Sequence, residues 1–253
     1  MKNSRWHIKR ISIEVIIIGA LYSVYTYTRN VSETSPSNAF HNAKKIIRLE
    51  EFLSIYIEKD IHKFFLNSEW IIIFANYYYG TLHFIVTIFA LLYVFSKDPV
   101  RYPKVRNTIV FTTLTALAGF LTFPLMPPRL LPKSYGFVDT LAKYPTFWSF
   151  NSKELAAVSN QFAAMPSVHI AWSTWCVFAL LPYIKKTWLK VLLYAYPLVT
   201  FFVIVVTSNH YILDAVGGWI VLSVGYLVSR MIASLTTRSA IDKTESLAEI
   251  NAK

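Results

Sequence analysis

The sequence predicts an all-α, polytopic membrane protein with six transmembrane helices and one amphipathic helix outside the membrane. The first observation is composition: 55% of the 253 residues are hydrophobic and 15% are charged, whereas a soluble domain carries about 25% charged residues. The second is that the apolar residues fall into blocks, each long enough for the helix of about 20 residues that crosses a bilayer core. The third is that short basic segments separate the blocks on one side only.

Six apolar blocks are the predicted spans of a single domain that covers residues 1–253. They lie at 11–27, 70–95, 108–125, 168–184, 188–207 and 212–232. The first block is short and contains Glu14, so an uncleaved signal anchor is the alternative. No small-x-small site follows it, which argues against a cleaved signal peptide. The polar tail at 235–253 is expected to be mobile.

The net charge of +11 predicts the orientation of the chain. With six spans, three lysine- and arginine-rich segments share a side with the C-terminal tail: 1–10, 96–107 and 185–190. Short basic loops mark the cytoplasmic face, so we expect an integral membrane protein, in the plasma membrane if the cell is bacterial. The segments expected on the extracytoplasmic side are 28–69, 126–167 and 208–211. Nucleic acid is not an expected partner, because the basic residues do not form one contiguous face.

Two of the outer segments have recognisable character. Hydrophobic residues recur every three or four positions across 41–66, which predicts an amphipathic helix at the outer interface or over the bundle. The loop 126–167 is long and rich in proline and aromatic residues, and long loops in compact domains are usually functional or disordered. We expect it to form a lid or a lipid entrance, with Phe147, Trp148 and Phe150 among its side chains.

The stretch MPSVHIAW, residues 165–172, predicts a helix that begins in a polar environment. Pro166 suits the first position of a helix, where its missing N–H costs nothing. The amides of Ser167, Val168 and His169 would then be open to an anion, which the helix dipole also favours. The alternative is a capped span with an interfacial histidine.

The stretch SNHYILDAVGGW, residues 208–219, carries two ionisable side chains at the start of an apolar run. His210 and Asp214 are four residues apart and share a helix face. A carboxylate on one imidazole nitrogen fixes the tautomer and leaves the other nitrogen for nucleophilic attack or proton transfer. A structural polar pair is the alternative. Gly217 and Gly218 would let a neighbouring helix approach closely.

A metal site is a further alternative for this pair, with His169 and His83 as additional ligands. The chain has one cysteine, Cys176, so it has neither an intrachain disulfide nor a cysteine metal cluster. We expect Cys176 to be a small packing residue.

Arg129, in the stretch FPLMPPRLLP at 123–132, is the third polar feature. Its guanidinium can bind a phosphate group at two points, although contact with lipid headgroups is the alternative. The charge-derived topology puts Arg129, the Ser167–His169 turn and the His210–Asp214 pair at the same side of the membrane. Together they suit phosphoryl transfer: groups that hold phosphate, a nucleophilic histidine and a second histidine to protonate the leaving oxygen.

MPSVH and HYILD resemble the second and third motifs of the type 2 phosphatidic acid phosphatase superfamily, P-S-G-H and S-R-x5-H-x3-D. The first motif, K-x6-R-P, is matched at Arg129 only, and the resemblance covers roughly 70–232. It implies that His210 is the nucleophile that forms a phosphohistidine, Asp214 its partner and His169 the general acid. Arg129 and the Ser167 turn would bind the phosphoryl oxygens.

Three residues depart from the family motifs: Thr122 replaces the lysine, Ile204 the arginine and Val168 the glycine. Fewer cations would suit a singly charged phosphodiester. The overall pattern is similar to the branch that includes inositol phosphorylceramide synthases and bacterial relatives, in which a head group passes to an alcohol. Tyr79 and His83 match that branch and are further candidates for substrate binding, with aromatic packing around a buried polar residue as the alternative.

The expected function is that of a membrane-embedded lipid phosphatase or phosphotransferase, without metal or cofactor, acting on a phospholipid or an isoprenoid phosphate or pyrophosphate. A head-group phosphotransferase and a non-catalytic transporter or lipid-binding protein are the alternatives. A serine hydrolase based on Ser167 is disfavoured, because the sequence has no G-x-S-x-G elbow.

Overall fold

The computed structural model describes residues 2–31, 35–144, 146 and 160–251. In this part of the chain the structure is helical, and its sole β feature is an isolated bridge between Leu125 and Ala163. The predicted all-α class is therefore confirmed for the described residues.

Five helical segments are long and apolar enough to cross a membrane. The first is Arg10–Thr28 within α1 (Lys2–Val31). The second, Glu69–Lys97, consists of three consecutive helices: α4 (Glu69–Tyr77), η1 (Tyr78–Leu82) and α5 (His83–Lys97). The others are α6 (Tyr102–Thr122), α10 (Thr187–Val206) and Ile212–Thr236 within α11 (Ile212–Asn251). The predicted count of six spans is not confirmed, because the segment expected at 168–184 is shorter. It consists of α9 (Val168–Leu180) and a single 3-10 turn, η4 (Leu181–Tyr183).

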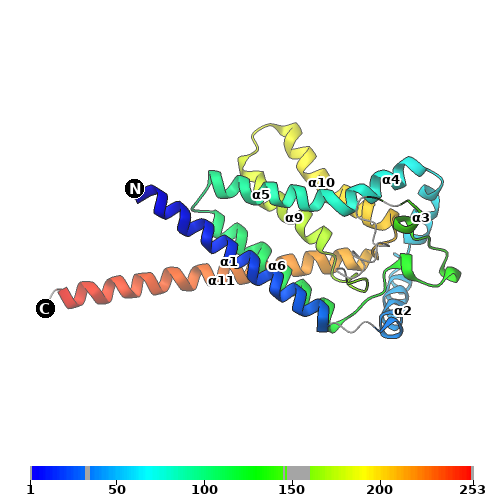
Figure 1. Cartoon of the computed structure of the whole chain (residues 1–253), viewed down its shortest axis with the longest axis horizontal. Helices are drawn as coiled ribbons and strands as arrows, with labels where there is room; N and C mark the ends of the chain where they lie inside the picture. Colours follow the sequence, from blue (N-terminus) through cyan, green and yellow to red (C-terminus); the bar gives the residue numbers. More distant parts are fainter. Residues whose placement is uncertain (1, 32–34, 145, 147–159, 252–253) are drawn as a thin grey trace.

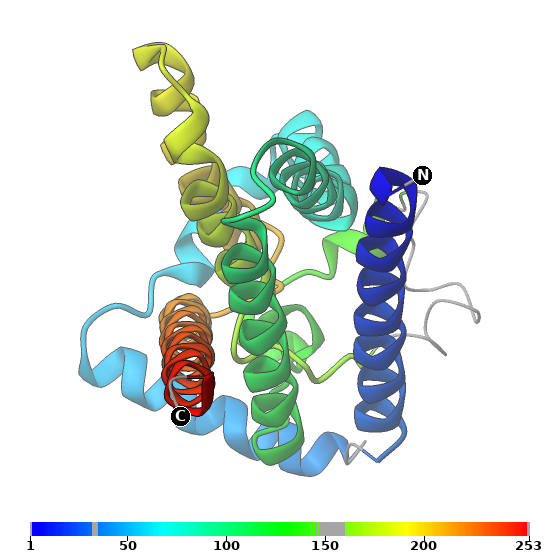
Figure 2. The same ribbon diagram turned by 90° about the vertical axis from the view of Figure 1, so that its left-hand side faces the viewer.

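α9 nevertheless runs between the same two ends of the bundle as α5 and α6. Its far end is tied to the α5–α6 connector, where Tyr183 donates to Asp98 at 2.9 Å and Arg101 donates to the Ala179 carbonyl at 2.8 Å. Its near end lies beside the start of α11, where Ser167 N–H donates to the Asp214 carbonyl at 2.9 Å. The long helices run alongside one another, and α2 (Pro36–Phe52) crosses one end of them (Figures 1 and 2).

Glu14, the acidic residue within the first apolar block, lies in α1. Glu14 pairs with Arg106 of α6 at 2.7 Å and accepts a hydrogen bond from the Tyr102 hydroxyl at 2.8 Å. An ionisable side chain within a span is tolerated when it is paired and faces the protein. Glu14 therefore ties α1 to α6, while most large apolar side chains of α1 remain exposed for lipid.

The predicted single amphipathic helix at 41–66 is wrong, because the chain forms two helices there. α2 begins at Pro36 after the Ser35 cap and ends at Phe52, and α3 spans Glu58–Leu66. Between them Ser54 has a left-handed backbone with φ 57°. The buried face of α2 packs over the end of the bundle in a cluster with Leu125, Met126 and Tyr211.

The long outer loop contains three short helical turns where it is described: η2 (Pro128–Leu130), η3 (Lys133–Tyr135) and α7 (Thr140–Lys143). Phe147, Trp148 and Phe150 lie outside the described residues, so the lid remains an expectation. The tail at 235–253, expected to be mobile, continues α11 as helix to Asn251.

Gly218 allows the start of α9 to approach α11 closely, as expected for the Gly217–Gly218 pair. A Cβ atom at Gly218 would lie 2.5 Å from the Ser167 carbonyl oxygen and 3.3 Å from the Ala171 amide. Both obstacles are backbone, so they cannot be relieved by rotating a side chain. Gly19 of α1, by contrast, has open space around a Cβ.

We expect Gly218→Ala to lower the free energy of unfolding by about 2 kcal/mol, the usual scale of overpacking. Gly19→Ala is the matched control and should be neutral or slightly stabilising, because alanine has the higher helix propensity. Thermal or denaturant unfolding in detergent measures both. Equal effects at the two glycines would contradict the close contact.

Candidate active site

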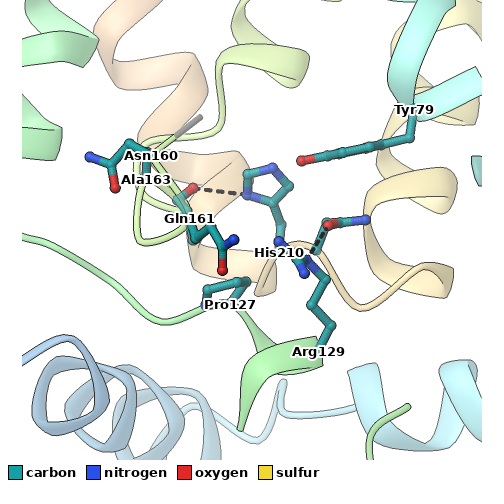
Figure 3. A pocket seen from close by; sticks show the side chains of 9 residues that line it. Tyr79, Pro127, Arg129, Asn160, Gln161, Ala163 and His210 are labelled. Atoms are coloured by element: carbon teal, nitrogen blue, oxygen red, sulfur yellow. Dashed lines mark hydrogen bonds between the residues drawn. The ribbon is translucent and has the colours of Figure 1, made fainter. Parts of the chain in front are cut away.

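Three segments that are distant in sequence meet at one end of the bundle. The loop after α6 is joined to the end of α10 by Arg129 N–H, which donates to the Ser208 carbonyl at 2.8 Å. The turn before α9 is joined to the first turn of α11 by the hydrogen bond from Ser167 N–H to the Asp214 carbonyl. These backbone contacts bring Arg129, the α9 start and the His210 region together (Figure 3).

His210 is held by two acceptors on the same ring nitrogen. Its Nδ1 lies 2.8 Å from the Ala164 carbonyl and 3.2 Å from Asp214 Oδ2. Because both groups are acceptors, Nδ1 carries the proton and Nε2 of the neutral ring keeps its lone pair. Nε2 is buried and has no hydrogen-bond partner among the described residues.

Asp214 is fully buried in the first turn of α11. Besides the His210 ring, its Oδ2 accepts the Tyr211 N–H at 2.9 Å. A helix N-terminus stabilises a carboxylate through its open amides and its dipole. The position of Asp214 in the first turn of α11 therefore aims its carboxyl group at His210.

The start of α9 differs in detail from the expectation. Ser167, not Pro166, is the residue that precedes the helix, so the prediction of Pro166 at the first helical position is wrong. The Ser167 amide is also not open, because it donates to the Asp214 carbonyl. The amides of Val168 and His169 remain as first-turn donors. Ser167 Oγ is buried and lacks a partner within the described part of the chain.

His169 lies in a group of four rings that come from η1, α5, α9 and the turn before α11. Its ring stacks on Tyr79 with centroids 4.2 Å apart, lies 4.2 Å from His83 and lies 5.6 Å from His210. Tyr79 sits in η1, a π-helical turn between α4 and α5, and such turns are frequent at functional sites. The structure thus brings both histidines of the motifs and both second-span candidates together.

Arg129 is held on two sides by residues that the sequence reasoning missed. Its Nε donates to Asn209 Oδ1 at 2.9 Å, and its Nη1 pairs with Asp139 Oδ2 at 3.0 Å. Asn209 in turn donates to Thr207 Oγ1 at 2.8 Å. Asn209 directly precedes His210 in a polar run, which was an available signal. No local pattern marked Asp139.

A pocket opens beside His210. Its walls are Tyr79, Pro127, Arg129, Asn160, Gln161, Ala163, Ala164, Asn209 and His210 (Figure 3). Three sequence-predicted residues line it, namely Tyr79, Arg129 and His210. The other four, Ser167, His83, His169 and Asp214, are not part of its wall. The amide side chains of the wall were not predicted, although Asn160 and Gln161 stand just before the MPSVH motif.

The two motif positions that lack cations do not face the pocket. Thr122 Oγ1 donates back to the Ala118 carbonyl of its own helix at 2.9 Å. Ile204 is fully buried in the core, and its carbonyl accepts the N–H groups of Asn209 and His210 at 3.0 and 3.2 Å. Among the described residues, no three His, Cys, Asp or Glu side chains are grouped so that they could hold a metal ion.

The helices and this site define a polytopic membrane protein with a buried histidine–aspartate pair and an arginine at one end of its bundle. The sequence profile of the PAP2 superfamily matches residues 44–228, well over half of the chain, and the chain belongs to that superfamily. The match includes every candidate site residue. Members of the superfamily are generally phosphatases. No curated protein and no solved structure matches the chain.

We expect His210 to be the Nδ1–H tautomer at neutral pH, because two acceptors face Nδ1 and none of the described groups bonds to Nε2. Nitrogen NMR of protein labelled with ¹⁵N-histidine distinguishes the two tautomers, and His210→Gln identifies the signal. Protonation at Nε2 with a bare Nδ1 would contradict the arrangement.

Proposed function

We propose that this protein is a membrane-embedded phosphatase or phosphotransferase that acts on a lipid phosphate through a phosphohistidine at His210. The observation that carries the proposal concerns the ring of His210, whose Nδ1 proton faces Ala164 and Asp214. Its Nε2 is buried and has no hydrogen-bond partner in the part of the chain that the structure describes. Buried polar atoms are normally hydrogen-bonded. A lone pair kept open beside a pocket that contains an arginine is therefore best explained by reaction with an electrophile.

In the first step, Nε2 of His210 attacks phosphorus, and the N–P bond forms as the bond to the leaving oxygen breaks. Protonated His169 donates its proton to that oxygen. Asp214 stabilises the positive charge on the His210 ring through Nδ1–H. Arg129 and the first-turn amides of α9 stabilise the charge on the phosphoryl oxygens.

In the second step, neutral His169 takes a proton from water or from an alcohol, whose oxygen attacks phosphorus. The N–P bond breaks and its electron pair returns to Nε2, which restores the enzyme. Water gives a phosphatase and an alcohol gives a phosphotransferase. We favour water, because a phosphatase needs no binding site for an acceptor.

A head-group transferase acting on a phosphodiester is the second candidate, and the charge of the pocket favours it. Arg129 is paired with Asp139, Ile204 is apolar, and the amides of Asn160, Gln161 and Asn209 supply neutral polar groups. A phosphodiester carries one negative charge and a terminal phosphomonoester nearly two. Neutral donors with one paired cation suit the singly charged group.

The active site is proposed to face the extracytoplasmic side. The connector between α5 and α6, which contains the basic residue Arg101, lies at the end of the bundle opposite the start of α11 (Figure 1). Positive residues in short loops mark the cytoplasmic face. The lipid of a bilayer, either a phospholipid or an isoprenoid phosphate or pyrophosphate, is the proposed substrate class.

We expect His210→Ala to lower turnover by on the order of 10³-fold or more, because the nucleophile is lost. The assay follows phosphate release and head-group transfer from a panel of lipid phosphates, pyrophosphates and phosphodiesters, with and without added alcohols. His41→Ala, an exposed histidine of α2, is the matched control and should leave turnover unchanged.

With an aryl phosphate, whose leaving oxygen departs without an acid, labelled phosphate should accumulate on the His169→Ala protein and not on the His210→Ala protein, because the second step then lacks its base. Wild-type turnover in His210→Ala would overturn the mechanism. Transfer only in the presence of an alcohol would favour the second candidate.

Asp139→Asn should raise turnover of phosphomonoesters relative to phosphodiesters by about fivefold, since removing one negative charge near Arg129 is worth on the order of 1 kcal/mol. Asparagine preserves the cap that Asp139 provides for α7. Asp60→Asn, an exposed change on α3, is the control. An unchanged substrate ratio in Asp139→Asn would show that the ion pair does not set the charge preference.

A further inference from the structure

The helices α2 and α3, called the outer helices, each contribute one glutamate that is buried at the start of α11, next to Asp214. Glu50 of α2 and Glu58 of α3 both have an exposed fraction of 0%. Glu50 Oε1 accepts the Leu213 N–H at 2.8 Å, and Glu58 Oε1 accepts the Ile212 N–H at 2.8 Å. The phosphatase chemistry proposed above assigns no role to either residue.

The first turn of α11 thus donates three successive amides to three carboxyl groups. Tyr211 N–H bonds to Asp214, Ile212 N–H to Glu58 and Leu213 N–H to Glu50. A helix start always has open amides, and usually one side chain of the cap and water satisfy them. Here carboxyl groups from three helices accept these amide protons.

The second oxygens of Glu50 and Glu58 indicate that the two groups share a proton. Both Oε2 atoms are buried and receive no donor from another described group, while the two carboxyls lie within hydrogen-bonding reach of each other. Two carboxylates in such contact cannot both be ionised at modest cost. One proton shared by the two carboxyl groups removes the repulsion and gives an otherwise unpartnered oxygen a donor.

The surroundings favour the protonated form. Burial, followed by the contact with Glu58 and the charge of Asp214, raises the pKa of Glu50 to about 9. The other titratable groups around the pair are Tyr211 from α11, Tyr56 and Glu51 from the α2–α3 segment, and Tyr135 from η3, next to Tyr56.

We propose that Glu50 and Glu58 share one proton and act as positioning residues, which fix the first turn of α11 and thereby hold Asp214 against His210. The catalytic part of this inference rests on the proposed function, whereas the structural part does not. Ile212 and Leu213 are the two residues that precede Asp214, so their amides set where its carboxylate lies. Neither glutamate touches the pocket.

The direction of the pH dependence follows from the raised pKa of Glu50. A carboxyl whose pKa is raised in the folded state contributes most below its ordinary pKa, and the contribution is lost as the pH rises through the folded value. Above about pH 9 the pair therefore carries two charges that repel. The outer helices then release the α11 start, and the His210–Asp214 contact loosens.

The first test follows the ¹⁵N signal of His210 between pH 7 and 10.5 in the full-length protein. In the wild type the signal should shift with a midpoint near pH 9. In Glu50→Gln it should not, because the glutamine amide donates permanently to Glu58 and still accepts from Leu213. Glu51→Gln, an exposed neighbour on α2, is the control and should retain the wild-type midpoint.

The second test measures kcat and KM on a substrate that the wild type turns over. A fall of tenfold or more in kcat above pH 9, with KM changed less than twofold, is expected in the wild type and absent in Glu50→Gln. Glu50→Ala should lose tenfold in kcat already at pH 7, and Glu50→Gln should restore it. If the role of Glu50 were purely structural, Glu50→Gln would have a lower melting temperature and its kcat would still fall above pH 9.

The two proposals fail in different ways. If the wild type turns over none of the substrates, the proposed function is wrong. The pH dependence of the His210 ¹⁵N signal then still tests the role of the two glutamates. A His210 signal that shifts equally in the wild type and Glu50→Gln, or shifts in neither, overturns the shared proton. Infrared spectra test the shared proton independently. The C=O band of a protonated carboxyl should disappear near pH 9 in the wild type, and it should be absent at every pH in Glu50→Gln.

Discussion

The first turn of α11 is held by hydrogen bonds on both sides of its backbone. Its amides at 211–213 donate to carboxyl groups of Asp214, Glu58 and Glu50, and the Asp214 carbonyl accepts the amide of Ser167. The outer helices, the α9 start and the histidine pair are therefore attached to one short stretch of backbone. In an interior with little water, each of these groups would be costly to leave unpaired. The site geometry follows from meeting that requirement.

Those parts of the fold that depend on local composition could be predicted from sequence. Apolar blocks of about 20 residues and the alternation of helices are properties of neighbouring residues, and the all-α class follows from them. The break in the outer helix could not be predicted, because the apolar period continues through Leu53 and Ile57. The chain turns there so that Glu50 and Glu58, on two different helices, both reach α11. These contacts with α11 belong to the tertiary structure, and the spacing of apolar residues along the chain does not reveal them.

The same distinction applies to the candidate site: contacts between residues close in sequence could be predicted, and contacts between distant segments could not. The spacing of His210 and Asp214 is local, so sequence suggested the contact that the structure contains at 3.2 Å. The predicted shared helix face is wrong, because His210 lies in the turn before α11. The shorter bond from His210 goes to the carbonyl of Ala164, 46 residues away, and a backbone acceptor has no sequence signature. Asp139 likewise pairs with Arg129 through a loop whose path cannot be read from its composition. Charges near a phosphate site must therefore be counted in three dimensions.

The length of α9 determines how deep the site lies. The segment Val168–Tyr183 is roughly 25 Å long at about 1.5 Å per residue, which is less than the 30 Å or so of a hydrocarbon core. Its far end is anchored to Asp98 and Arg101 in the basic connector, so the shortfall falls at the Ser167 end. With the basic connector at one membrane surface, as proposed, His210 would be recessed below the headgroups of the other surface by about one helical turn. For the proposed lipid phosphatase, a substrate would reach that depth by entering sideways between helices with its chains still in the bilayer, a route that a water-soluble phosphate ester lacks.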